Sequence, residues 1–124
     1  MGKMTRKGLV KKLDDLIRKA CLIRDDNQCQ WCGSKSNLQL SHVRSRKFYE
    51  TRWELGNVKI LCAGCHFRWH ENPVEADAWF DGKFPARRQW ILELKKRPVG
   101  TWRDSDLLAI KETLERKINE LENE

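Results

Sequence analysis

The chain has 124 residues, enough for one compact domain but too few for two domains with independent cores. Lysine and arginine number 25 against 18 aspartate and glutamate residues, and the resulting net charge of +7 favours a polyanionic partner. No apolar stretch reaches the roughly 20 residues that span a bilayer, and the basic N-terminus lacks the apolar segment of a signal peptide. We therefore expect a soluble, cytoplasmic protein with no membrane partner, folded as a single domain over residues 1–124.

Residues 6–24 are predicted to form a helix, because apolar residues from Leu9 to Ala20 recur at helical spacing. Residues 1–24 carry 8 basic and 2 acidic side chains, residues 25–70 carry 7 and 4, and residues 71–124 carry 10 and 12. This concentration of positive charge favours DNA contact by the first helix over a merely solvated lysine-rich face. Cys21 lies on the apolar stripe and is predicted to be a small buried hydrophobe.

Four of the five cysteines form two C-x2-C pairs, Cys29 with Cys32 and Cys62 with Cys65. Each pair can bend so that both sulfur atoms face one ion, and cytosolic thiols stay reduced, so the spacing predicts a four-thiolate structural zinc site. The 29 residues between the pairs exceed the roughly 15 to 20 of an ordinary zinc ribbon. A further structural unit is therefore expected between them.

The residues between the pairs have a strand-like pattern at both ends. A short strand is expected over residues 38–42, ending in His42, and a second over residues 58–61, after Asn57. A short helix then carries His66 and His70, which are four positions apart and so lie on one helix face. Both imidazoles can therefore reach one metal ion.

This order of elements and residues resembles the HNH nuclease family, also called the His-Me finger, whose core is a ββα-metal fold. The resemblance covers about residues 28–72 and rests on the spacing of His42, Asn57, His66 and His70. The stretch from Ser45 to His70, with Thr51-Arg52-Trp53 before the asparagine, looks most like small HNH proteins of phages and mobile elements. It implies a small α+β protein in which an HNH core is stapled by the four-cysteine zinc and surrounded by helices over residues 6–24 and 73–124.

The resemblance also implies a function, that of a metal-dependent endonuclease that nicks or cuts DNA. His42 would be the general base, and Asn57 would tie the loop that directs it. His66 and His70 would hold a catalytic divalent ion, which can be Mn²⁺, Mg²⁺, Ni²⁺, Co²⁺ or Zn²⁺, and His66 counts with His42 and Asn57 among the implied catalytic residues. Many family members carry an acidic or histidine metal ligand just before the first histidine, where this chain has Ser41.

Other interpretations stay open at this point. A histidine that ends a strand can be structural, and an asparagine after a glycine can simply serve a turn. The second cysteine pair could form a zinc site with a helix histidine, leaving the first pair unused. Ser41 keeps open a non-catalytic, zinc-stabilised DNA-binding module with the same fold.

The predicted core contains basic and aromatic side chains for which contacts can be expected. The candidates for phosphate contacts, each of which could instead be an ordinary surface charge, are Arg44, Arg46, Lys47, Arg52 and Arg68. Four tryptophans are expected to pack in the small core rather than stack on bases: Trp31, Trp53, Trp69 and Trp79.

The C-terminal extension is predicted to be helical. One helix begins with Asn72 as its cap and Pro73 in its first position, and another starts near Pro85 and ends before Pro98. The last helix spans about residues 104–122, and its apolar stripe is wide enough to dock on the core. A homodimer through a coiled coil of this helix is the alternative.

Overall fold

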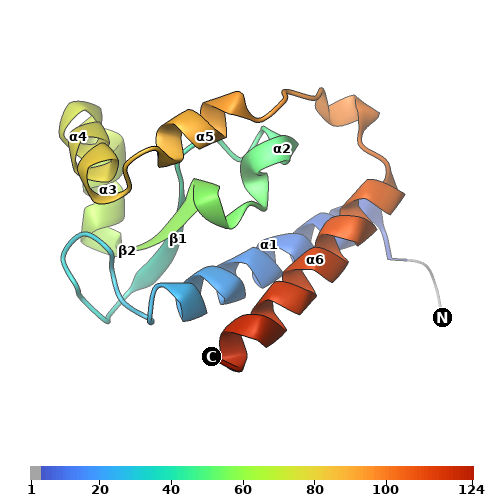
Figure 1. The fold of residues 1–124 in the computed structure, drawn as a ribbon, viewed down its shortest axis with the longest axis horizontal. Coiled ribbons are helices and arrows are strands. Elements are labelled where there is room, and N and C mark those ends of the chain that lie inside the picture. Colours follow the sequence, from blue (N-terminus) through green and yellow to red (C-terminus); the bar gives the residue numbers. More distant parts are fainter. Residues whose placement is uncertain (1–3) are drawn as a thin grey trace.

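The fold is small and of the α+β class (Figure 1). A computed structural model describes residues 4–124, so the first three residues, part of the segment expected to contain no signal peptide, lie outside it. The elements in chain order are α1 (Arg6–Arg24), β1 (Leu38–His42), α2 (Tyr49–Arg52), the 3-10 helix η1 (Leu55–Asn57), β2 (Val58–Cys62), α3 (Ala63–Glu71), α4 (Pro73–Lys83), α5 (Arg87–Glu93), the 3-10 helix η2 (Val99–Thr101) and α6 (Asp104–Glu122). The predicted first and last helices are confirmed.

β1 and β2 form a two-stranded antiparallel sheet that leads directly into α3. In its register Leu38 pairs with Cys62 and His42 pairs with Val58. The second cysteine pair therefore lies at one end of the hairpin and His42 at the other. α3 carries His66 and His70 and packs on the hairpin, and α1 contacts β2 of the same hairpin.

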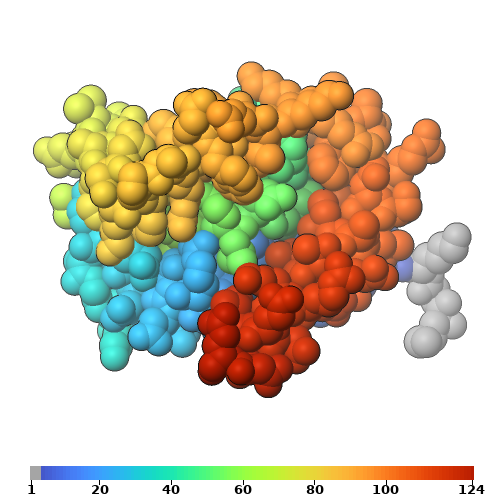
Figure 2. Space-filling view, viewed as in Figure 1, coloured from blue at the N-terminus to red at the C-terminus, as the bar shows by residue number. Residues whose placement is uncertain are grey.

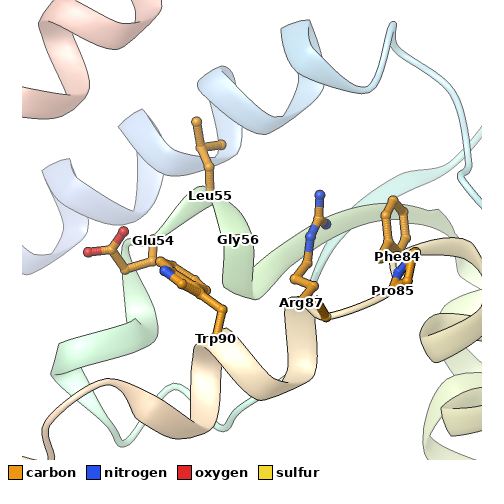
Figure 3. Close-up of a pocket in the computed structure, with 8 residues that line it drawn as sticks. Glu54, Leu55, Gly56, Phe84, Pro85, Arg87 and Trp90 are labelled. Atoms are coloured by element: carbon orange, nitrogen blue, oxygen red, sulfur yellow. The ribbon is translucent and has the colours of Figure 1, made fainter.

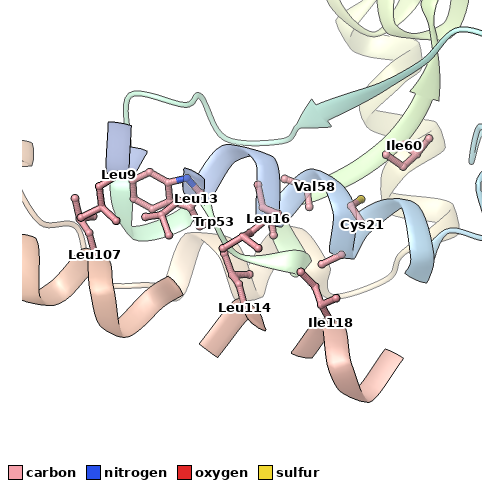
Figure 4. Close-up of a cluster of buried hydrophobic side chains, with 12 residues drawn as sticks. Leu9, Leu13, Leu16, Cys21, Trp53, Val58, Ile60, Leu107, Leu114 and Ile118 are labelled. Atoms are coloured by element: carbon pink, nitrogen blue, oxygen red, sulfur yellow. The ribbon is translucent and has the colours of Figure 1, made fainter. Parts of the chain in front are cut away.

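The larger of two apolar clusters lies between α1, the hairpin and α6. Leu9, Leu13 and Leu16 of α1 pack with Leu107 and Leu114 of α6 (Figure 4). The two helices lie side by side, and Arg6 pairs with Asp104 near one end while Lys19 pairs with Glu122 near the other. Docking of the last helix is confirmed, and the buried part of its stripe is not free to pair with a second chain.

The smaller cluster lies on the other side of the hairpin, beneath α3 and α4. Its buried members are Cys29, Leu61, Cys65, Trp69, Ala76 and Phe80. Trp53 and Trp69 are buried as predicted, whereas Trp31 and Trp79 are half-buried and stack on each other with ring centroids 4.7 Å apart. Cys21 is fully buried in the larger cluster, which confirms its assignment as a small hydrophobe.

One helix cap and one helix start differ from their predictions. α4 begins at Pro73, but within residues 4–124 the Asn72 side chain makes no capping hydrogen bond. The Asn72 backbone N–H donates to the Arg68 carbonyl and ends α3, so the same residue closes one helix and precedes the next. α5 begins at Arg87 rather than Pro85, because Ala86 has the left-handed conformation with a φ of 70°. No helix among residues 4–124 has the length and apolar character needed to cross a membrane.

Gly56 gives the best-defined steric test of the fold. The ring of Trp90 on α5 packs against it, and a Cβ at position 56 would lie 2.4 Å from a Trp90 ring carbon (Figure 3). In Figure 2 the surface around η1, drawn in green, lies between α5 above it and α6 below it. A side chain at position 56 must therefore displace Trp90 and with it α5.

We expect Gly56→Ala to lower the stability of the protein by about 1–3 kcal/mol, the usual effect of forcing an extra methyl group into a packed site. Thermal unfolding measures the loss, and tryptophan fluorescence reports the displaced indole. Gly82→Ala is the matched control, because a Cβ at position 82 meets nothing within 4 Å and alanine is the better helix former. Equal melting temperatures for the two variants would contradict the assigned packing.

Candidate metal and histidine site

The four paired cysteines come together in space. Their sulfur atoms all lie within 4.8 Å of one another, and the sulfur atoms of Cys32 and Cys62 are 3.6 Å apart. A tetrahedral zinc ion with bonds of about 2.3 Å places its sulfur ligands about 3.8 Å apart, so the cluster is close enough to hold one metal ion. Because both pairs take part, the alternative that leaves the first pair unused does not fit.

Backbone N–H groups point at these sulfur atoms. The N–H groups of Trp31 and Cys32 lie 3.4 and 3.5 Å from the Cys29 sulfur, and that of Cys65 lies 3.4 Å from the Cys62 sulfur. Burial alone would raise the pKa of the Cys29 thiol, but hydrogen bonds from backbone N–H groups outweigh it and lower the pKa to about 7. Cys29 is thus held close to the thiolate, the form that binds metal, whereas burial and the neighbouring thiols raise the pKa of the Cys65 thiol.

His66 and His70 meet at their outer nitrogen atoms, since the two Nε2 atoms are 3.2 Å apart. Two nitrogen ligands of one ion with bonds of about 2.1 Å lie about 3.0–3.4 Å from each other in tetrahedral or octahedral geometry. The distance between the two Nε2 atoms therefore matches the spacing of two imidazole ligands of one metal ion. This donor set lacks a carboxylate, and imidazole nitrogen suits Zn²⁺, Co²⁺, Ni²⁺ or Mn²⁺ better than Mg²⁺.

Gln39 orients one of these histidines. Its Oε1 lies 2.6 Å from His66 Nδ1, and an amide oxygen only accepts hydrogen bonds, so Nδ1 carries the hydrogen and Nε2 keeps its lone pair for a metal. Gln39 was not among the site residues predicted from the sequence. The available signal was a polar residue within the first predicted strand, but its contact depends on how α3 packs against that strand.

His42 ends β1 and is held from the loop that follows. Its Nε2 lies 3.1 Å from the backbone carbonyl of Arg52, so in the neutral ring Nε2 donates and Nδ1 remains an acceptor. His42, His66 and His70 line one hollow of about 480 Å³. The other residues around that hollow are Leu40, Val43, Ser45, Arg46 and Trp69. The predicted base and the predicted metal ligands thus share one cavity.

The environment of His42 keeps its ring neutral. Burial lowers the pKa of His42 to about 4, and the charges of Arg46 and Arg52 add to this shift, while the Arg52 carbonyl and the Asp14 carboxylate oppose it. A neutral imidazole can accept a proton at physiological pH, although a low pKa also makes it a weaker base.

Asn57 is fully buried and closes the base of the same loop. Its Oδ1 accepts the Arg44 N–H at 2.8 Å, and its Nδ2 donates to the Arg44 carbonyl at 3.2 Å. Its own carbonyl accepts the Val43 N–H at 2.8 Å. Asn57 therefore fixes the two residues that follow His42, which is a positional contribution to the hollow.

Ser41 is not free to act as a metal ligand. It is fully buried, and its hydroxyl accepts a hydrogen bond from Lys59 Nζ at 2.9 Å. The Lys59 amine also lies 3.4 Å from the centre of the Trp69 ring, and burial lowers its pKa to about 6. The Ser41 hydroxyl is thus engaged by an amine and is not open to a metal ion.

The five basic candidates for phosphate contact differ in availability. Arg52 forms an ion pair with Asp14 at 2.7 Å, and its side chain is only 14% exposed. It therefore stabilises the fold and is not free to bind phosphate. Arg46 and Lys47 are exposed, although Arg46 also pairs with Asp14 at 3.0 Å. Arg44 packs over the Phe48 ring, and the exposed Arg68 stacks over Trp31 at 4.1 Å.

Comparisons of the chain with protein-family models, with curated proteins and with solved structures yield no match. What the protein does must therefore be inferred from its own residues and their geometry.

We expect the His42 ring to stay neutral far below the usual pKa of a histidine. A lowered pKa means that the folded state favours the neutral ring, so the stability this provides is complete above about pH 6.5 and is lost as the pH falls toward about 4. The measurement is an NMR titration of the ring resonances in protein without added catalytic metal. A His42 midpoint near 6.5 would contradict the buried, carbonyl-bound geometry.

Proposed function

We propose that this chain is a metal-dependent endonuclease of the HNH type that hydrolyses phosphodiester bonds of DNA. The observation that carries the proposal is the shared hollow, in which a neutral, carbonyl-bound His42 lies beside two histidines with converging Nε2 atoms. A general base next to a site for a divalent ion is the combination that such hydrolysis needs.

Each residue of the hollow has a distinct task in this proposal. His42 accepts the proton of the attacking water at Nδ1, because its Nε2 is occupied by the Arg52 carbonyl. His66 and His70 would hold a divalent ion, which supplies positive charge to the phosphate as negative charge develops on it. Gln39 keeps His66 in the tautomer that can bind the ion, and Asn57 keeps the loop at His42 closed.

Positive charge around the hollow supports a nucleic-acid substrate. Arg46 lines the hollow beside His42 and also lines a second depression with Arg18 of α1. The two depressions share His42, so a strand that crosses the proposed base can continue onto the basic N-terminal helix. Exposed cations such as Arg46 and Arg18 bind phosphates irrespective of sequence.

The four-cysteine cluster is proposed to hold a structural Zn²⁺. Cys62 is the N-cap residue of α3, so its thiolate fixes the start of the helix that carries His66 and His70. Binding of zinc to such sites contributes on the order of 10 kcal/mol to folding in small zinc modules. The structural ion thus acts on the catalytic hollow through the position of one short helix. The resemblance of the stretch from Ser45 to His70 to small HNH proteins of phages and mobile elements supports an origin of that kind.

A second candidate function is a DNA-binding module without catalysis. The hydrogen bond between Ser41 and Lys59 favours it, because it leaves two imidazoles as the protein ligands identified for a catalytic ion. Two neutral ligands bind a hard ion such as Mg²⁺ weakly. A protein with this ligand set would retain the zinc and the DNA contacts but cleave only with softer metals, or not at all.

The proposal is tested by nicking of supercoiled plasmid with a panel of Mn²⁺, Co²⁺, Ni²⁺, Zn²⁺ and Mg²⁺. We expect cleavage by the wild type, and a loss of about 100-fold or more in rate for His42→Ala, as is typical when a general base is removed. DNA affinity should stay close to that of the wild type, because a base acts only in the chemical step.

Ser45→Ala is the matched control, since Ser45 lines the same hollow but has no group that titrates near neutral pH. It should cleave at nearly the wild-type rate. Equal rates for His42→Ala and the wild type would show that His42 is not the base. Retained DNA binding by a wild type that is inactive with every metal would instead favour the non-catalytic module.

A further inference from the structure

Asp14 of α1 gathers four hydrogen-bond donors from the loop that holds His42. Its Oδ1 accepts from Arg52 Nε at 3.0 Å and from Trp53 Nε1 at 2.9 Å. Its Oδ2 accepts from Arg52 Nη2 at 2.7 Å and from Arg46 Nη2 at 3.0 Å. The pair with Arg52 is a two-pronged, charge-assisted contact, which is the strongest and most directional kind of side-chain hydrogen bonding.

Arg52 links Asp14 to His42, the proposed base, because its side chain binds Asp14 and its backbone contacts His42. The backbone carbonyl of Arg52 is the group that accepts the hydrogen bond of His42 Nε2. Arg52 ends α2, a helix of only four residues whose N-terminus has no side-chain cap within the described part of the chain. A helix of that length is not stable alone, so its carbonyl is placed by what the flanking side chains contact. Asp14 is therefore the anchor of the carbonyl that directs His42.

Electrostatics give Asp14 a second contribution at the same place. Arg46 and Arg52 bring two positive charges toward His42, and the Asp14 carboxylate binds both arginines and lines one depression with the His42 ring. His42 lines two depressions. One of them is also lined by Asp14, Asp15, Arg18 and Arg46, and the other is the hollow that contains His66 and His70. Asp14 is the carboxylate that binds both Arg46 and Arg52.

We propose that Asp14 is a positioning residue for His42, through which the N-terminal helix fixes the tautomer and the direction of the imidazole. The proposal rests on the proposed function only in taking His42 as the base. Its consequence is that the ββα unit is not a complete site by itself, because α1 supplies the carboxylate that holds the His42 loop.

The test compares Asp14→Asn with Asp15→Asn. Both variants remove one negative charge from the same helix and the same depression, but Asp15 pairs only with the exposed Lys11 in the described part of the chain. In long-range ¹H–¹⁵N NMR spectra, wild type and Asp15→Asn should show His42 as the Nε2–H tautomer alone. Asp14→Asn should show a mixture of the two tautomers, and its nicking rate should fall by roughly 10-fold to 100-fold.

The outcomes separate this proposal from the proposed function. A single Nε2–H tautomer in Asp14→Asn would overturn it, even if that variant melted at a lower temperature, because a merely structural role changes stability without releasing the imidazole. A tautomer mixture in Asp14→Asn would support it, even if the wild type nicked no DNA, in which case only the proposed function would fail.

A second variant guards against loss of folding in Asp14→Asn. Arg52→Lys keeps the positive charge but cannot make the two-pronged contact with the Asp14 carboxylate. It should give the same tautomer mixture, and Asp14→Glu should restore the single tautomer in part by reaching Arg52 again. A single tautomer in Arg52→Lys would overturn the proposal in the same way as in Asp14→Asn.

Discussion

The antiparallel pairing of β1 with β2 is the constraint on which the placement of the functional side chains depends. Its register sets Cys62 opposite Leu38 and His42 opposite Val58. A slip by one residue would turn every side chain of a strand to the other face of the sheet. The Cys62 thiol, the Gln39 amide and the His42 ring would then all leave their present partners. A sheet of two strands is too small to hold such a register alone, so the pairing must be supported from outside.

Much of that support comes from the end of α1. The Asp25 carboxylate accepts the Ile60 N–H of β2 at 2.9 Å, and Arg24 donates to the carbonyls of Leu55 and Val58. Further along the same helix, Asp14 binds the loop that carries Arg52. α6 in turn covers the apolar side of α1. The N-terminal helix is thus a structural partner of the hairpin as well as a carrier of positive charge.

The elements predicted best from the sequence are those defined by local patterns. Apolar periodicity located α1 and α6 at their observed bounds, and cysteine spacing was enough to predict that four sulfur atoms meet. Both signals depend only on residues that are close in sequence or on one ligand chemistry. The same reasoning placed His66 and His70 on one face of a helix, where their Nε2 atoms are found 3.2 Å apart.

Contacts between elements distant in sequence could not be predicted in this way. Gln39 reaches His66 across 27 positions, and Asp14 reaches Arg52 across 38, so both contacts follow from how the helices dock. Arg52 was a candidate for phosphate contact because a basic residue in the core looks the same in sequence whether it faces a phosphate or a buried carboxylate. From the sequence, Ser41 indicated only that an acidic ligand is lacking at this position. Its hydrogen bond with Lys59 depends on the strand register, which sets the two residues opposite each other.

The proposed function requires two separate metal sites on the chain, one made of cysteines and one of histidines. Titration of metal-free protein with Co²⁺, followed by absorption, tests it most directly because thiolate and imidazole ligands give different spectra. We predict that the first equivalent gives a tetrahedral spectrum with thiolate charge-transfer bands and that a second, weaker equivalent binds without thiolate. In the double variant His66→Ala, His70→Ala the second equivalent should disappear while the thiolate bands persist unchanged. A single equivalent in the wild type, or loss of the thiolate bands in the double variant, would contradict this division.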